Sequence, residues 1–321
     1  MLCNWITRYL DIIFLSFASA QTSIWSNWWT YDGISGPRYW GLNPEWILCQ
    51  VGKYQSPIDI QPEKLLYDPA LTAVLFPSKK MNGNLTNTGH DVTFHVEDDL
   101  LPHFNVTSGP LQYEYRIYQI KIHFAHSDVV GSEHLINGLS FPAEVQIMAY
   151  NADLCDNFTQ ALVAPNGLAI FAIFVEIGQV GNEAFTILAD NLKYIPSKGQ
   201  SSWISGLPLN ILLPRTTQYM TYEGSTTQPG CQETVTWIIF NKPIYVLKEQ
   251  MFELRKLNQK GGSDQQLLIE GNVRPIMPLN NRVIRTNIKY ENKIKNCTVT
   301  KEVFYEVNTL RNNVRRKREG R

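Results

Sequence analysis

The stretch "YQIKIHF", residues 118–124, decides how this chain folds, because its apolar and polar side chains alternate. In a β-strand, successive side chains point to opposite faces. One face would carry the apolar side chains of Tyr118, Ile120, Ile122 and Phe124. The other face would carry Gln119, Lys121 and His123. An amide, an amine and an imidazole on one face of a strand otherwise suited to burial indicate a polar site inside the fold.

A second stretch, "AEVQIMAY" at 143–150, divides in the same way, with Glu144, Gln146 and Met148 on one side. The loop before it is long enough to return the chain antiparallel, which would place Lys121 and His123 beside Gln146. Two residues at i and i+2 on one strand and one on its neighbour can hold a tetrahedral metal with an open fourth position.

The rest of the chain also favours strands. Period-two or short apolar runs recur between Gly, Pro and Asn residues, as in "DVTFHVED" (91–98), "GLAIFAIFVEIG" (167–178) and "TVTWIIF" (234–240). Helical spacing is confined to two segments, 183–194 and 248–257. The pattern predicts a mainly β (α+β) fold with few helices.

Both ends of the chain differ from this pattern. Residues 1–20 have the form of a secretory signal peptide, with an apolar run from Leu10 to Ala18 and small residues before Gln21. A membrane anchor or a misassigned start is the alternative, but the run falls short of the ~20 residues of a span, and no other segment is long and apolar enough. We therefore expect no membrane span.

The same division assigns 21–290 to one folded domain and 291–321 to a polar, basic tail. Arg315 to Arg318 form a run that suits a processing protease, or simply a solvated tail.

Several features indicate export. Four N-x-Ser/Thr acceptors begin at Asn84, Asn105, Asn157 and Asn296. Once Cys3 leaves with the signal, four cysteines remain, and these allow three pairings. Basic and acidic residues number 29 each, so no overall field attracts nucleic acid. We expect a secreted, extracellular glycoprotein with a disulfide bond and a protein partner.

The chain resembles the α-class carbonic anhydrases from about Trp28 to Ile288. The matching stretches are "GPRYWG" (36–41), "QSPIDI" (55–60), "NTGHDV" (87–92), "YRIYQIKIHF" (115–124), "GSEH" (131–134), "PNGLAIFAIF" (165–174), "VTWIIF" (235–240) and "RPIMPLNNR" (274–282). The resemblance implies a single domain around a twisted, mostly antiparallel sheet of about ten strands with short peripheral helices.

In active members of that family three histidines hold zinc, and their positions match Lys121, His123 and Gln146. The resemblance also implies roles for surrounding residues: Gln119 and Glu144 orient zinc-bound histidines, Glu133 and Thr227 hydrogen-bond the zinc hydroxide, His90 is the proton shuttle, and Tyr31 and Trp237 line the cavity. Because Lys121 and Gln146 replace two of the three histidines, these family roles would be vestigial here. Thr226 stands where an apolar pocket wall is usual and Gln228 where a second hydroxyl is usual, which disfavours substrate binding even with the metal restored.

Lys121 makes zinc binding costly. An ammonium about 4 Å from a divalent ion would repel it by about 8 kcal/mol at an effective dielectric near 20. Structural zinc sites typically supply only ~10–16 kcal/mol, and the Gln146 carbonyl is a poor zinc ligand. We predict no metal and no cofactor, and we expect Lys121 to donate hydrogen bonds to Gln146, Thr227 or Glu144.

The other histidines point to no second site. His123 alone suits a hydrogen-bonded core histidine, and His126 would lie on the opposite strand face from His123. His95, His103 and His134 carry no motif.

Within the family the chain is similar to the secreted, acatalytic carbonic anhydrase-related proteins, which resemble ligands of neurexin-type synaptic receptors. The shared stretches include 25–57, 222–246 and a C-terminal extension with its own cysteine. The resemblance implies a Cys49–Cys231 disulfide. Cys155 and Cys297 then bond to each other, or Cys297 bonds to a partner. The alternative function is a weak zinc-dependent carbonic anhydrase or an esterase-like remnant.

Overall fold

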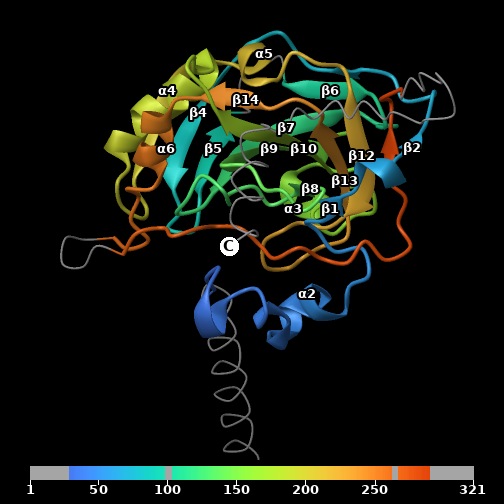
Figure 1. Cartoon of the computed structure of the whole chain (residues 1–321), viewed down its shortest axis with the longest axis horizontal. Coiled ribbons are helices and arrows are strands. Elements are labelled where there is room, and N and C mark those ends of the chain that lie inside the picture. Colours follow the sequence, from blue (N-terminus) through green and yellow to red (C-terminus); the bar gives the residue numbers. More distant parts are fainter. Residues whose placement is uncertain (1–28, 98–102, 262–266, 290–321) are drawn as a thin grey trace, which may run out of the picture.

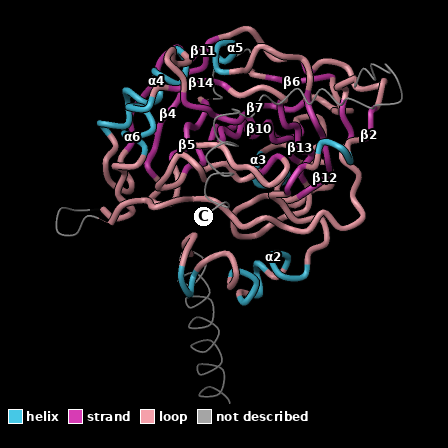
Figure 2. Tube along the Cα trace, in the orientation of Figure 1, coloured by secondary structure: helices cyan, strands magenta, loops and turns pink. Residues whose placement is uncertain are grey.

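The computed structural model describes residues 29–97, 103–261 and 267–289, and a sheet of thirteen strands runs through it (Figures 1 and 2). Its strands are β2 (Leu66–Tyr67), β3 (Val74–Leu75), β4 (Lys80–Asn87), β5 (Val92–Val96), β6 (Asn105–Ser108), β7 (Tyr115–Phe124), β9 (Ala143–Asn151), β10 (Leu168–Ile177), β11 (Ser201–Pro208), β12 (Tyr219–Gly224), β13 (Val235–Phe240), β14 (Ile244–Val246) and β15 (Arg285–Thr286). β1 (Asp59–Ile60) and β8 (Leu135–Ile136) form a separate parallel pair.

The main path of the sheet runs β11-β4-β5-β7-β9-β10-β13-β12-β15-β2. Most neighbours are antiparallel, whereas β10 pairs in parallel with β13 and β14, and β15 pairs in parallel with β2. The predicted mainly β, mostly antiparallel fold is therefore confirmed. Short strands of two to four residues, β3, β6 and β14, join beside the ten strands of the main path.

The helices are short and lie at the periphery of the sheet (Figure 1). They are α2 (Leu48–Val51), α3 (Phe158–Ala161), α4 (Glu183–Asn191), α5 (Leu209–Leu212) and α6 (Lys248–Leu254), with 3-10 turns η1 (Gly33–Ser35), η2 (Trp40–Leu42), η3 (Pro44–Trp46), η4 (Pro62–Lys64) and η5 (Leu192–Tyr194). The predicted helix 183–194 is α4 followed by η5. The predicted helix 248–257 ends at Leu254, three residues early.

The two faces of the sheet bury different cores. Ile120, Ile122 and Phe124 of β7 belong to the core that α4 and α6 cover, as the alternating pattern predicted. Tyr118 does not share their face: its ring stacks on Phe158 of α3, at 4.3 Å between centroids, on the other side of the sheet. The prediction for Tyr118 was wrong because a bulge between Ile117 and Gln119 shifts the alternation by one residue.

The register of β7 against β9 places the polar residues together. Lys121 lies directly opposite Gln146, and His123 lies opposite Glu144, in the expected antiparallel arrangement. On its other side β7 pairs with β5, where Thr93 faces Lys121. Three adjacent strands therefore contribute side chains to one region of the sheet face.

A lobe formed by residues 29–54 lies below the sheet in Figure 1 and includes α2. The Cys49–Cys231 disulfide, with 5.0 Å between the Cα atoms, ties this lobe to the loop that follows β12. Trp40 is buried against the two cysteines. A search of the described residues finds no helix with the length and apolar character needed to cross a membrane.

Candidate functional site

Lys121 is buried, and its ammonium group has two partners on other strands and loops. Nζ donates to Asp91 Oδ2 at 3.0 Å and to Gln228 Oε1. Gln228 closes a triangle, because its Nε2 donates to the same Asp91 oxygen at 2.6 Å. The expectation that Lys121 bonds Gln146, Thr227 or Glu144 was wrong, because Asp91 offers it a carboxylate from the start of β5.

Asp91 is built to remain ionised although it is buried. Burial pushes the pKa of its carboxyl upward, but the Lys121 charge and hydrogen bonds from Thr93, Lys121 and Thr88 lower it well below its ordinary value. The hydroxyls of Thr93 and Thr88 donate to Oδ1 at 2.7 and 2.8 Å. A buried carboxylate with this many donors forms a charge pair with Lys121 that excludes a second cation from the same position.

Gln146 belongs to a different network from its cross-strand neighbour Lys121. Its amide Nε2 donates to Glu133 Oε2 at 2.8 Å and to Glu144 Oε1 at 3.0 Å. Glu133 Oε1 accepts the backbone N–H of Arg274 at 3.0 Å. Among the described residues, no hydrogen bond joins Glu133 to Thr227. Thr227, the residue directly before Gln228, is buried.

His134, for which the sequence offered no motif, is central to this second network. Its backbone N–H and its Nδ1 contact the two oxygens of Glu144, at 2.8 and 2.9 Å. Its Nε2 contacts the Tyr222 hydroxyl at 2.7 Å, and Tyr222 donates onward to Ser56. Burial raises the pKa of Glu144, but the neighbouring His134 outweighs it and the pKa lies below its ordinary value.

His123 lies between the two networks and is fully buried. Its Nδ1 lies 2.7 Å from the backbone carbonyl of Asn272, so this nitrogen is the donor and Nε2 carries the lone pair. Nε2 is buried and has no hydrogen-bond partner among the residues that the structure describes. It is the single ring nitrogen at the three matched positions that retains a free lone pair.

The remaining predicted residues lie around these networks. Gln119 donates to the Met148 sulfur at 3.1 Å, and the Trp237 ring packs 4.6 Å from that of His134. Thr226 accepts the Gln232 N–H with its hydroxyl. His103, the first residue of the described range 103–261, is half-buried, and His95 is exposed on β5.

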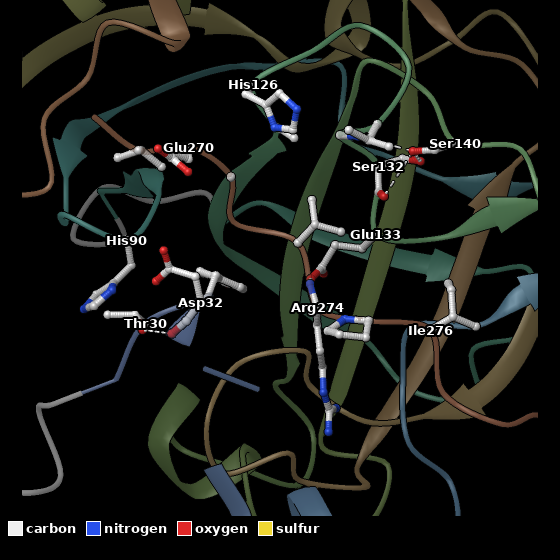
Figure 3. A pocket seen from close by; sticks show the side chains of 18 of the residues that line it. Thr30, Asp32, His90, His126, Ser132, Glu133, Ser140, Glu270, Arg274 and Ile276 are labelled. Atoms are coloured by element: carbon white, nitrogen blue, oxygen red, sulfur yellow. Dashed lines mark hydrogen bonds between the residues drawn. The ribbon is translucent and has the colours of Figure 1, made fainter. Parts of the chain in front are cut away.

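A cavity of about 380 Å³ lies beside the polar strands and does not include Lys121, His123 or Gln146 in its lining. In Figure 3, His90, Asp32 and Glu270 lie at one side of this cavity and Ser132 and Ser140 at the other. His126 also lines it; β7 ends at Phe124, so His126 lies beyond the strand and the predicted strand face does not apply to it. Tyr31 lines it too and accepts a long hydrogen bond from Gln228.

His90 lies at the edge of the cavity and stacks on Trp29, with 4.0 Å between ring centroids. Burial lowers the pKa of His90, and the charges of Lys198 and Lys121 add to the effect against the opposing charge of Asp91. Burial likewise raises the pKa of Tyr31. Both rings therefore stay neutral at neutral pH.

The predicted Cys49–Cys231 disulfide is present. Cys155 is a buried free thiol in the described region, and burial raises its pKa. Asn84 and Asn157 are exposed and Asn105 is half-buried. The signal peptide 1–20, the tail 291–321 with Arg315 to Arg318, Asn296 and Cys297 lie outside the described residues.

The residues at the matched metal positions do not fit zinc. Lys121 is an ammonium held by Asp91 and Gln228, and the Gln146 amide nitrogen donates to two carboxylates. The described residues contain no group of three or more His, Cys, Asp or Glu suited to a metal ion. Of the three matched positions only His123 offers an imidazole nitrogen without a hydrogen-bond partner among the described residues, and the Gln146 carbonyl oxygen is a poor zinc ligand.

Comparison with known proteins identifies the family of this chain. The family model "Eukaryotic-type carbonic anhydrase" matches residues 35–288. A Caenorhabditis elegans relative, named as carbonic anhydrase-like protein 2, is 36% identical over 299 residues that cover 88% of this chain and 87% of the relative. The chain is thus a carbonic anhydrase-like protein, and it belongs to the eukaryotic-type carbonic anhydrase family.

Proposed function

We propose that this protein is a secreted, catalytically inactive member of the family that acts as an extracellular ligand of cell-surface receptors. The observation that carries the proposal is the closed triangle of Lys121, Asp91 and Gln228. It places a fixed positive charge, already paired with a buried carboxylate, at a position where active members have a zinc ligand.

The chemistry of the family explains why this arrangement is incompatible with turnover. Hydration of carbon dioxide by these enzymes depends on a zinc-bound water whose pKa is lowered to about 7. Lys121 supplies a positive charge but cannot hold a water as a Lewis acid does. Gln228 also occupies the space next to Thr227 and is fixed by Asp91 and Lys121, so the site beside the lost metal is filled by protein.

Two further observations support the proposal, one on the compartment and one on the activity. The Cys49–Cys231 disulfide suits an oxidising compartment. The relative from Caenorhabditis elegans is named as carbonic anhydrase-like, which is a name for likeness and not for activity. The proposed partner is a protein of the neurexin type, bound on the outer surface or through the tail.

The zinc content and carbon dioxide hydration rate of the purified secreted protein test the loss of activity. We expect neither zinc nor hydration above that of a Lys121→Ala control. The variant Lys121→His with Gln146→His should acquire zinc, measured by metal analysis, because His123 and the Glu133 and Glu144 carboxylates are already in place. Stoichiometric zinc with turnover in the unaltered protein would favour the alternative, a weak carbonic anhydrase.

Binding to a neurexin-type ectodomain, measured under non-reducing conditions, tests the partner. Covalent linkage that disappears in Cys297→Ser would assign that cysteine to the partner. Peptide mapping provides the counter-test: a Cys155–Cys297 peptide would remove the covalent role, and Cys155 is a buried free thiol in the described region. A protein that stays in the cytosol would contradict the proposal altogether.

A further inference from the structure

The long open edge of the sheet carries an exposed aromatic residue. β11 is the first strand of the sheet order, and no described strand lies beyond it. Its eight residues contain no charged side chain, and Trp203, the third of them, is 51% exposed. The opposite edge, β2, has two residues. Proteins usually protect a long edge strand with charge, a bulge or a cover, because an open edge pairs with other chains. In β11 a bulge between Ile204 and Leu207 interrupts the second half of the strand, and the first half, 201–204, has neither a bulge nor a charge.

Trp203 has a glycan acceptor as its direct cross-strand neighbour. Trp203 of β11 pairs with Asn84 of β4, and Asn84 pairs in turn with His95 of β5. Residues paired across antiparallel strands lie on the same face with Cβ atoms roughly 5 Å apart. The buried neighbours Leu85 and Ile204 belong to the core under α4, so Asn84 and Trp203 point to the opposite, solvent side.

The three described glycan-acceptor asparagines differ in the hydrogen bonds that their side-chain amides form. Asn105 donates to Glu114 at 2.8 Å, and the Asn157 oxygen caps α3 by accepting the N–H of Gln160. Asn84 is exposed, and its side chain forms no hydrogen bond with the residues described in the structure. Modification of the Asn84 amide nitrogen therefore displaces no hydrogen bond of the described fold, whereas modification of Asn105 displaces its bond to Glu114.

We propose that Asn84 carries an N-linked glycan whose first sugar packs on the exposed face of Trp203 and covers the β11 edge. The apolar C–H face of a pyranose ring fits an indole face, and the strand spacing brings the two within contact. The inference rests on the proposed function insofar as it requires the secretory pathway.

The bond that forms joins C1 of the first N-acetylglucosamine to Asn84 Nδ2. The bond that breaks is the one between C1 and a phosphate oxygen of a lipid-linked diphosphate oligosaccharide, the donor of secretory-pathway glycosylation. The amide nitrogen loses one proton, and the lipid diphosphate leaves. Thr86, two residues after Asn84, completes the acceptor motif and pairs with Ser201 on the same edge.

The position of this glycan restricts where a partner binds. His95, next to Asn84, pairs with Gln119 of β7, so the glycan stands two strands away from the polar strand face. A bulky, hydrated oligosaccharide at this place covers the β11 side of that face. The partner surface consequently lies away from β11, toward the lobe of residues 29–54 or the tail.

The test combines glycan mapping with hydroxyl-radical footprinting of the full secreted chain. Mass spectrometry should find Asn84 occupied. Trp203 oxidation should rise about twofold in Asn84→Gln and in Thr86→Ala, since a sugar covers one of the two indole faces. Trp46, half-buried in the lobe, is the internal control whose oxidation should not change. Trimming the glycan to its first sugar should keep Trp203 protected.

Two results would overturn the inference while leaving the proposed function intact. One is an unoccupied Asn84 in a secreted protein whose other acceptors carry glycans. The other is an occupied Asn84 with Trp203 oxidised as fast as in Thr86→Ala. A protein without any glycan that never enters the secretory pathway would instead contradict the proposed function.

Discussion

The two buried carboxylates that flank the altered metal position, Asp91 and Glu144, are kept ionised by different means. Asp91 faces the Lys121 ammonium and two threonine hydroxyls, so a full charge pair opposes its burial. Glu144 is held by the backbone and ring of His134 and by the Gln146 amide. One side of the site holds an internal cation, the Lys121 ammonium, whereas the other is a hydrogen-bond network around Glu144.

This difference shows two ways in which the fold satisfies a buried carboxylate. A carboxylate network left without its cation needs new donors, because an unpaired buried charge costs several kcal/mol. Gln146 supplies two N–H donors to Glu133 and Glu144. Lys121 brings a charge that would be unstable alone, and Asp91 neutralises it. Lys121 and Gln146 thus have different carboxylate partners: Asp91 for Lys121, and Glu133 and Glu144 for Gln146.

The largest effect is expected when the charge pair is broken on one side. Lys121→Met leaves the Asp91 carboxylate buried without its cation, and removal of one partner of a buried pair typically destabilises by ~3–5 kcal/mol. Urea unfolding followed by circular dichroism measures this loss. The Cys49–Cys231 disulfide stays intact in both proteins, so the comparison isolates the charge.

A double variant and a surface pair serve as controls for this measurement. Lys121→Met with Asp91→Asn should recover much of the loss, because no unpaired charge remains. Asp68→Asn breaks the partly exposed Arg285–Asp68 pair, in which the arginine side chain is 42% exposed, and should cost at most about 1 kcal/mol. Equal losses for Lys121→Met and Asp68→Asn would show that Lys121 and Asp91 do not act as a buried pair.

A smaller effect is expected on the Glu144 side. Glu144→Gln keeps one acceptor oxygen for His134 but loses the charge and one acceptor, for which we expect ~1–3 kcal/mol. Thermal unfolding at neutral pH measures it. A loss larger than that of Lys121→Met would reverse the comparison. The hydrogen-bond network of Glu144 would then contribute more to the free energy of unfolding than the Lys121–Asp91 charge pair does.

In the unaltered protein, lowering the pH should reduce the stability that ionised Asp91 contributes. The pKa of folded Asp91 is below its unfolded value, so the folded state binds fewer protons and the stabilisation is present above about pH 3.9. As the pH falls below that value the stabilisation is lost, by about 1.4 kcal/mol per pH unit for one proton. Asp91→Asn should show a shallower acid limb in urea unfolding. Identical limbs would contradict the assigned shift.

The sequence predicted the strands of this site well because alternation and antiparallel return are local properties. Lys121 opposite Gln146 follows from the pattern of two strands and the loop between them. The sequence pattern did not predict the partner of Lys121. Asp91 directly precedes a third strand, β5, and no local pattern specifies the register of β5 with β7. The available signal in the sequence was Asp91, a carboxylate that lies directly after His90 and directly before an apolar strand.

Tyr118 and His134 escaped prediction for different physical reasons. A bulge adds one residue to β7, and period-two reasoning has no means of locating it. His134 lies in the "GSEH" stretch outside any long strand, and its role depends on Glu144, ten residues further on, and on Tyr222, 88 residues further on. Residues whose role is fixed by tertiary contacts alone are the ones that sequence periodicity misses.

The smallest expected effect lies at His90, where no charge pair compensates burial. The pKa of folded His90 is below its ordinary value of about 6.5, so its small contribution to stability is present above that pH and is lost as the pH falls. NMR titration of the His90 ring protons should give a midpoint below 6.5. Lys198→Gln should raise that midpoint, because the exposed Lys198 ammonium opposes protonation of the ring. An unchanged midpoint would show that burial beside Trp29, and not the Lys198 charge, lowers the pKa of His90. The Lys121–Asp91 pair would then be the place at this site where one charge offsets another.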